Sequence, residues 1–93
     1  MGHYIVERFV PGATTDDVKA WAEALEISIR TLDVRGEITH LGSELMNHDE
    51  TCLCFFDATD AGLVRKVNDH AGTPYERVLD GQSVRKPTEG KSE

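Results

Sequence analysis

Two kinds of apolar periodicity along the chain predict its secondary structure. Residues 3–10 (HYIVERFV) and 51–57 (TCLCFFD) are rich in β-branched and aromatic side chains, which favours β-strands. Residues 37–46 and the shorter stretch 75–79 are predicted as two further strands. Elsewhere, apolar residues recur at steps of three and four, the pattern of a helix that buries one face. They are Val18, Trp21, Ala22, Leu25, Ile29 and Leu32 in one segment, and Leu63, Val64, Val67 and Ala71 in another.

Capping and turn residues separate these elements. Thr14 precedes Asp17 by three positions, the spacing of a capping box at a helix start. The polar residues 47–50 (NHDE) predict the loop of a hairpin between the second and third strands. The second helix is predicted to begin near Thr59 and to end at Gly72, because glycine favours the C-terminal cap.

The predicted order is therefore β-α-β-β-α-β, which is the ferredoxin-like split βαβ pattern. Right-handed crossovers place both helices on one face of a four-stranded antiparallel sheet. Ninety-three residues suffice for one domain, which we assign to residues 1–84. The charged residues 85–93 are predicted to be a disordered C-terminal tail.

Charge and cysteine content narrow the choice of partners and compartment. The net charge of −7 disfavours nucleic acid, since an acidic surface repels a phosphate backbone. The longest apolar run, residues 52–56, is far too short to span a membrane. Cys52 and Cys54 lie two residues apart, where a disulfide would be strained, so we expect reduced, buried thiols and a cytoplasmic protein.

The face of the sheet without helices needs a cover. If the loop 47–50 closes the hairpin in simple register, strand alternation assigns residues 40–57 to two faces. The face under the helices then carries Leu41, Ser43, Leu45, Cys52, Cys54 and Phe56, and the open face carries His40, Gly42, Glu44, Leu53, Phe55 and Asp57. A shift of one residue would exchange these partners. Because Leu53 and Phe55 would not stay bare to water, we expect a homodimer that encloses a cleft between two sheets, as in dimeric α/β barrels.

Three polar residues on this open face suggest chemistry. In simple register His40 lies opposite Asp57, and a carboxylate can orient an imidazole for metal binding or for acid–base work. Glu44 shares the face, so the three residues offer one nitrogen and two carboxylates to a divalent metal. The alternative interpretation is a solvated polar rim at the end of a strand pair.

His3 is a second candidate ligand. A retained Met1 amine, the backbone nitrogens of Gly2 and His3, and the His3 imidazole offer four nitrogens in one plane, a set that suits Ni(II) or Cu(II). The alternative is the exposed first residue of a strand, and removal of Met1 would abolish the chelate. His48 in the hairpin loop and His70 near a helix C-terminus are interpreted as structural.

Two segments carry a resemblance to a known family. YIVERFVPG at residues 4–12 and CFFDATDAGLVRKVNDHAGTPYERV at residues 54–78 resemble a small bacterial ferredoxin-like family of uncharacterised proteins that has a nickel-binding branch. The resemblance implies a ferredoxin-like dimer and divalent-metal binding. Asp57 and Thr59 replace the family's usual Glu and Pro, and Asn68 stands where the nickel branch has a histidine. No ligand set therefore carries over residue by residue.

Three hypotheses follow from the sequence. The first is a homodimer that binds Ni(II) or another divalent metal through His3, His40, Glu44 and Asp57. The second is an enzyme or small-molecule binder whose inter-sheet cleft is lined by Leu53 and Phe55, with His40 and Asp57 as an acid–base pair. The third is an interaction module without a ligand. A deep apolar cavity beside His40 would favour the second.

Overall fold

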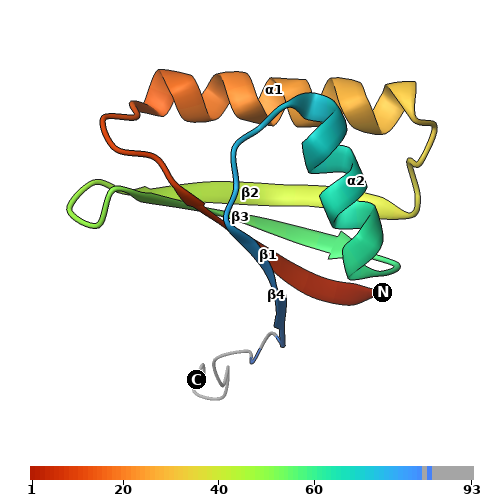
Figure 1. Cartoon of the computed structure of the whole chain (residues 1–93). Helices are drawn as coiled ribbons and strands as arrows, with labels where there is room; N and C mark the ends of the chain where they lie inside the picture. Colours follow the sequence, from red (N-terminus) through yellow and green to blue (C-terminus); the bar gives the residue numbers. More distant parts are fainter. Residues whose placement is uncertain (83, 85–93) are drawn as a thin grey trace, which may run out of the picture.

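The computed structural model describes residues 1–82 and 84 and has the predicted order of elements (Figure 1). They are β1 (Gly2–Phe9), α1 (Thr15–Thr31), β2 (Ile38–Met46), β3 (Thr51–Ala58), α2 (Ala61–Ala71) and β4 (Arg77–Gly81). The tail predicted at residues 85–93 lies outside the described residues. Within the described part of the chain, no helix is long and apolar enough to cross a membrane.

The four strands form one antiparallel sheet in the order β2-β3-β1-β4. Both helices lie on the same side of this sheet, and the other side carries none (Figure 1). This arrangement confirms the ferredoxin-like fold. It also leaves one face of the sheet, called here the open face, without a covering layer in a single chain.

The helix ends follow from local hydrogen bonds. Thr14 and Asp17 form the predicted capping box, in which each side chain bonds the other residue's backbone N–H. α2 begins at Ala61, two residues after its predicted start near Thr59, because Asp60 is the N-cap and its side chain accepts from the backbone N–H of Leu63 at 2.8 Å. Gly72 ends α2 in the left-handed conformation, with φ of 72°, as its position predicts.

The last strand begins two residues later than predicted. Tyr75 packs on the core and its hydroxyl donates to Asp69 at 2.8 Å, so it belongs to the connection that leaves α2. β4 pairs with β1 only from Arg77, which lies opposite Glu7. The composition of residues 75–79 favoured a strand, but tertiary packing determines where pairing starts.

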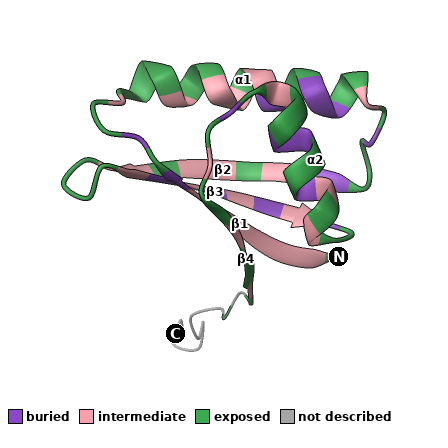
Figure 2. Ribbon diagram, viewed as in Figure 1, coloured by how far each residue is buried: buried purple, intermediate pink, exposed green. Residues whose placement is uncertain are grey.

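Burial alternates strictly along the central strand β3, whose residues are half-buried and buried in turn (Figure 2). The buried positions face the helices and build the core with one side of each helix. The core contains Val6, Val10, Leu25, Ile29, Val34, Ile38, Cys52, Cys54, Phe56, Ala58, Val64 and Val67. Both cysteines are free and buried, as expected.

The β2–β3 hairpin keeps the predicted register from its loop as far as Gly42. Gly42 lies opposite Phe55 and Glu44 opposite Leu53, as predicted. Between Gly42 and His40 the register shifts by one residue, and Leu41 forms the extra residue of a bulge, half exposed to solvent. Gly42 adopts φ of 148° there, a conformation that other residues rarely take.

This bulge overturns one prediction. His40 lies opposite Phe56, not Asp57, and its ring packs on the buried Phe56 ring at a centroid distance of 4.9 Å. Thr39 takes the place opposite Asp57. His40 and Asp57 therefore point to opposite faces of the sheet. The assumption of simple register was therefore wrong beyond Gly42. In the sequence, Gly42 itself is the residue that indicates a β-bulge.

Candidate functional site

The open face does hold an imidazole–carboxylate pair, but its histidine is His3. β1 and β3 pair so that His3 lies directly opposite Asp57. Nδ1 of His3 is 3.2 Å from Oδ1 of Asp57, within hydrogen-bond and ion-pair distance. The carboxylate thereby orients the ring and favours the tautomer whose Nε2 has its lone pair available, which is the arrangement of a metal-ligating histidine.

Neighbouring residues hold this pair in place. The His3 ring stacks on Phe55 with an interplanar angle of 10° and a centroid distance of 6.4 Å. Gly81 lies opposite His3 on the β4 side, where a Cβ atom would come within 3.0 Å of the imidazole. The His3 side chain is 22% exposed and that of Asp57 is 47% exposed, so both remain accessible from the open face.

The strand register arranges the open face in cross-strand rows. One row holds Thr39, Asp57, His3 and Gly81; the next holds Gly42, Phe55, Ile5 and Leu79; a third holds Glu44, Leu53, Glu7 and Arg77. The middle row is apolar, with Leu79 exposed and Phe55 and Ile5 half-buried. Polar rows therefore flank an apolar strip on the open face.

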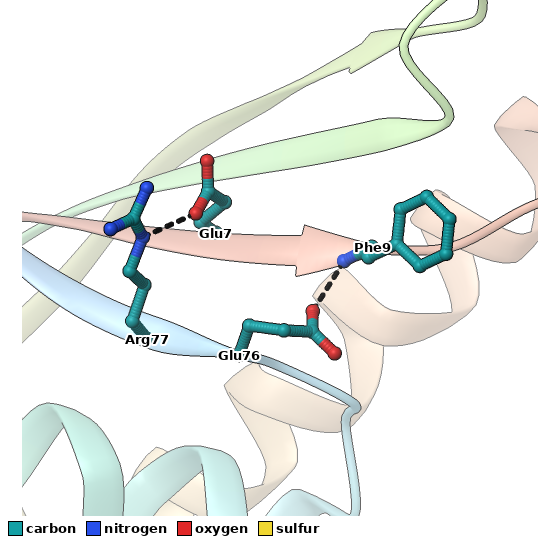
Figure 3. A network of polar contacts seen from close by, with 4 residues as sticks. All are labelled: Glu7, Phe9, Glu76 and Arg77. Atoms are coloured by element: carbon teal, nitrogen blue, oxygen red, sulfur yellow. Dashed lines mark hydrogen bonds and ion pairs between the residues drawn. The ribbon is translucent and has the colours of Figure 1, made fainter.

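The third row contains an ion pair near the end of β1. The Arg77 guanidinium donates to the Glu7 carboxylate across the β1–β4 pair (Figure 3). The Phe9 backbone N–H donates to the carboxylate of Glu76, the residue just before β4, while the Phe9 ring projects away from it (Figure 3). Phe9 is 55% exposed and extends the apolar surface of the open face.

The remaining predicted ligands do not join His3 and Asp57 within one chain. His40 points to the helix-covered face. Glu44 lies on the open face opposite Leu53, four residues along β3 from Asp57, which corresponds to about 13 Å along the strand. Across residues 1–82 and 84, no group of three His, Cys, Asp or Glu side chains is close enough to hold a metal ion. One chain therefore supplies a pair of donors where a divalent metal takes at least four.

The N-terminal chelate conflicts with the observed structure. Gly2 and His3 belong to β1 and pair with Ala58 and Asp57 of β3, while Nδ1 of His3 bonds the Asp57 carboxylate. A four-nitrogen clamp would have to break these contacts. His3 is the second residue of β1 and half-buried, so it is not the exposed first residue of the alternative interpretation, and its ring is the partner of a carboxylate.

The cleft of the second hypothesis is not present in one chain. Leu53 and Phe55 lie half-buried on the open face, as predicted, but over the described residues a single chain contains no pocket. His40, the proposed base, lies on the other face. An acid–base role for His40 with Asp57 therefore has no geometric basis.

A group that the sequence analysis missed lies under the helices. Arg8 is completely buried and contacts Cys54, whose thiol also contacts Ser43. Strand alternation did carry a signal, because Arg8 falls in step with the buried Val6 of β1 and with the buried Val10 just after it. Of the other histidines, His70 bonds Ser28 of α1 at 2.9 Å, and His48 lies exposed in the hairpin loop.

The fold and the open-face pair define a small ferredoxin-like α+β protein. Residues 4–80 match the family model described as "Nickel responsive protein SCO4226-like", and the chain belongs to this family. The crystal structure of SCO4226 from Streptomyces coelicolor A3(2) has a TM-score of 0.74 and 14% identity, covering 89% of this chain and 99% of that one. This similarity shows a shared fold. No curated protein matches the chain.

Proposed function

We propose that this protein is a homodimer that binds a divalent metal, nickel in the first instance, at the His3–Asp57 pair. The observation that carries the proposal is the 3.2 Å contact between Nδ1 of His3 and Asp57, which prepares an imidazole for a metal. The family's description as nickel responsive supports the choice of metal. Imidazole is a suitable ligand for nickel.

Two features of the open face favour a second copy: an apolar strip without a cover and a metal site with too few ligands. Ile5, Phe55 and Leu79 form an apolar strip of the kind that soluble proteins cover, and Leu53 of the adjoining row extends it. The His3–Asp57 pair, at the same time, supplies too few ligands to complete a metal site. Packing two open faces against each other would bury the strip and double the number of ligands.

The cross-strand rows indicate how two copies would meet. His3 and Asp57 lie on the two central strands, β1 and β3, while Arg77 and Glu44 lie at opposite ends of their row. A twofold axis parallel to the strands, between the sheets and midway between β1 and β3, sets each His3 against the second copy's Asp57. The same axis sets each Glu44 against the second copy's Arg77, which is electrostatically favourable.

This arrangement would gather two imidazoles and two carboxylates around the axis. Packed sheets lie about 10 Å apart, a gap that facing side chains can fill. The proposed stoichiometry is therefore one metal ion per two chains. We also propose a cytoplasmic location, because both cysteines are free and lie in the core.

Titration calorimetry with Ni(II) on the tag-free protein tests the proposal. We expect saturation at one ion per two chains, and loss of the binding heat in His3→Ala and in Asp57→Asn. His48→Ala and His40→Ala are matched controls that each remove an imidazole away from the site, and both should bind as wild type does. Undiminished binding by His3→Ala would refute the proposed site.

A further inference from the structure

The helix-covered face of the sheet encloses an unusual charge. Arg8 is the largest side chain that the fold buries completely, with 0% of its surface exposed. It extends from β1, between the inward-facing Val6 and Val10, toward α2. Removing a guanidinium from water costs several kcal/mol unless an anion and hydrogen bonds compensate.

The partners of Arg8 come from three parts of the chain. Nη1 donates to the Pro74 carbonyl at 2.8 Å, and Nη2 donates to Oδ1 of Asn68 at 2.8 Å. Nε donates to Sγ of Cys54 at 3.3 Å. In the described part of the chain, no carboxylate lies within ion-pair distance of Arg8. Of its three partners, only the Cys54 sulfur can carry a negative charge.

The surroundings of Cys54 favour that charge. Oγ of Ser43 lies 2.9 Å from the Cys54 sulfur, and Nε2 of His40 lies 3.2 Å from Oγ of Ser43. Burial raises the pKa of Cys54, but the interaction with His40, the charge of Arg8 and the hydrogen bonds of Ser43 and Arg8 outweigh burial and lower the pKa to about 7. Burial and the neighbouring Cys54 raise the pKa of Cys52 to about 12. The two thiols therefore differ, and Cys54 ionises first.

We propose that Cys54 forms a buried thiolate–guanidinium ion pair with Arg8, and that proton uptake by the sulfur releases the hold of Arg8 on α2 and on the connection to β4. Asn68 and Pro74, the other two Arg8 partners, lie in that region of the chain, in the last turn of α2 and just beyond the helix. Once the sulfur is neutral, the guanidinium is left buried without an anion. Local opening of this region lets water solvate the guanidinium and costs less free energy than unfolding the whole chain.

The proton has a defined route. His40 and Ser43 are half-buried, whereas Cys54 is buried beneath them. A proton taken up by His40 from solvent can pass through the Ser43 hydroxyl to the Cys54 sulfur, converting thiolate to thiol. The bulge at Leu41 turns His40 to this face and so completes the chain of hydrogen bonds.

Few other charges can influence this titration. The titratable groups that face Cys54 are Arg8 from β1, His40 from β2 and Cys52 from β3. The buried residues of the two helices above are Leu25, Ser28, Ile29, Val64, Val67 and Asn68, and none of them carries a charge. The pair is also separate from the His3–Asp57 site on the open face, so either proposal can fail without the other.

Ultraviolet absorbance of the thiolate tests the ion pair directly in the folded protein. From about pH 5 to pH 8, where an ordinary cysteine with a pKa of 9.0 is still largely protonated, we expect one thiolate per chain to appear near pH 7. Cys52→Ala should keep this step, and Cys54→Ser should lose it. A wild-type protein that gains no thiolate until pH 9 would overturn the proposal.

Hydrogen exchange tests the release of the contacts. The Thr73 amide bonds the Asn68 carbonyl beside the Arg8 contact. After correction for intrinsic rates, we expect its protection to fall about tenfold for each pH unit from pH 9 down to pH 7, where the closed region holds the thiolate and the opened region the thiol, and to level off below pH 7. Cys54→Asp, which keeps a negative charge, should retain high protection at acid pH, and Cys54→Ser should show low protection at every pH. Equal behaviour of the Asp and Ser variants would contradict the proposed release.

Discussion

The two faces of the sheet stabilise their polar groups by opposite means. On the open face, His3 and Asp57 stay partly exposed, and water can solvate whatever their mutual contact does not satisfy. On the helix-covered face, Arg8 and Cys54 are buried away from bulk solvent, so their donors and charges depend on protein partners. Loss of a partner should therefore be tolerated on the open face and costly under the helices.

The largest effect is expected from removing the anion under the helices. Cys54→Ala leaves Arg8 buried without a counter-ion, and breaking a buried pair in this way costs about 3–5 kcal/mol of unfolding free energy. Cys52→Ala, two residues along the same face, is the matched control and should cost about 1 kcal/mol as an ordinary apolar truncation. Urea denaturation at pH 8 measures both. Equal losses would contradict the charge on Cys54.

The next largest effect is expected on the open face, in association rather than folding. Phe55→Lys should leave the chain folded but monomeric, because each copy loses an apolar contribution of roughly 1.5–3 kcal/mol to the interface. Ile27→Lys replaces a half-exposed apolar residue of α1, away from this face, and should leave the dimer intact. Sedimentation velocity distinguishes the two variants. A dimeric Phe55→Lys protein would indicate another interface.

Stability should depend on pH through Cys54. Its pKa is about 7 in the folded protein against an ordinary value of 9.0, so between these pH values the unfolded chain holds a proton that the folded one lacks. The unfolding free energy should therefore rise from pH 7 to pH 9, by on the order of 2 kcal/mol.

Cys52 has the opposite effect at higher pH. Its pKa of about 12 exceeds the ordinary value of 9.0, so stability should decline above pH 9. Urea denaturation at pH values from below 7 to above 9 tests both the rise and the decline of the unfolding free energy. Cys54→Ser is the control that should lose the rise between pH 7 and pH 9. A flat profile in the wild type would count against both thiol assignments.

The smallest effect is expected for the Glu7–Arg77 pair. The Arg77 side chain is 63% exposed, so solvent screens most of its interaction with Glu7. A double-mutant cycle with Glu7→Gln and Arg77→Gln should give a coupling energy for monomer folding that disappears in high salt. A coupling that persists in high salt would mean that the open face is shielded from water even in a single chain.

The sequence predicted the architecture because the architecture depends on patterns that a sequence displays. Apolar spacing placed both helices, the capping box placed the start of α1, and alternation placed Leu53 and Phe55 on the open face. These features are local or depend on strand alternation alone. The family resemblance, carried by residues 4–12 and 54–78, is confirmed by the family match over residues 4–80.

The site was harder to predict because it depends on register between distant strands. One bulge residue, Leu41, moved His40 from the open face to the buried one. His3 and Asp57 were each candidates, but they are 54 residues apart in sequence, and their pairing depends on the β1–β3 register, which no local signal indicates. Arg8 was missed because a charged residue is not expected at an inward strand position. The partners that compensate its charge come from distant parts of the chain, and the sequence does not show them.

Native mass spectrometry of the wild-type protein with added Ni(II) tests most directly the claim that two open faces meet around one metal. The account predicts a species of two chains with one nickel ion, and an Asp57→Asn protein that carries none. Nickel bound to single chains, or a dimer whose nickel content is unaffected by Asp57→Asn, would contradict it.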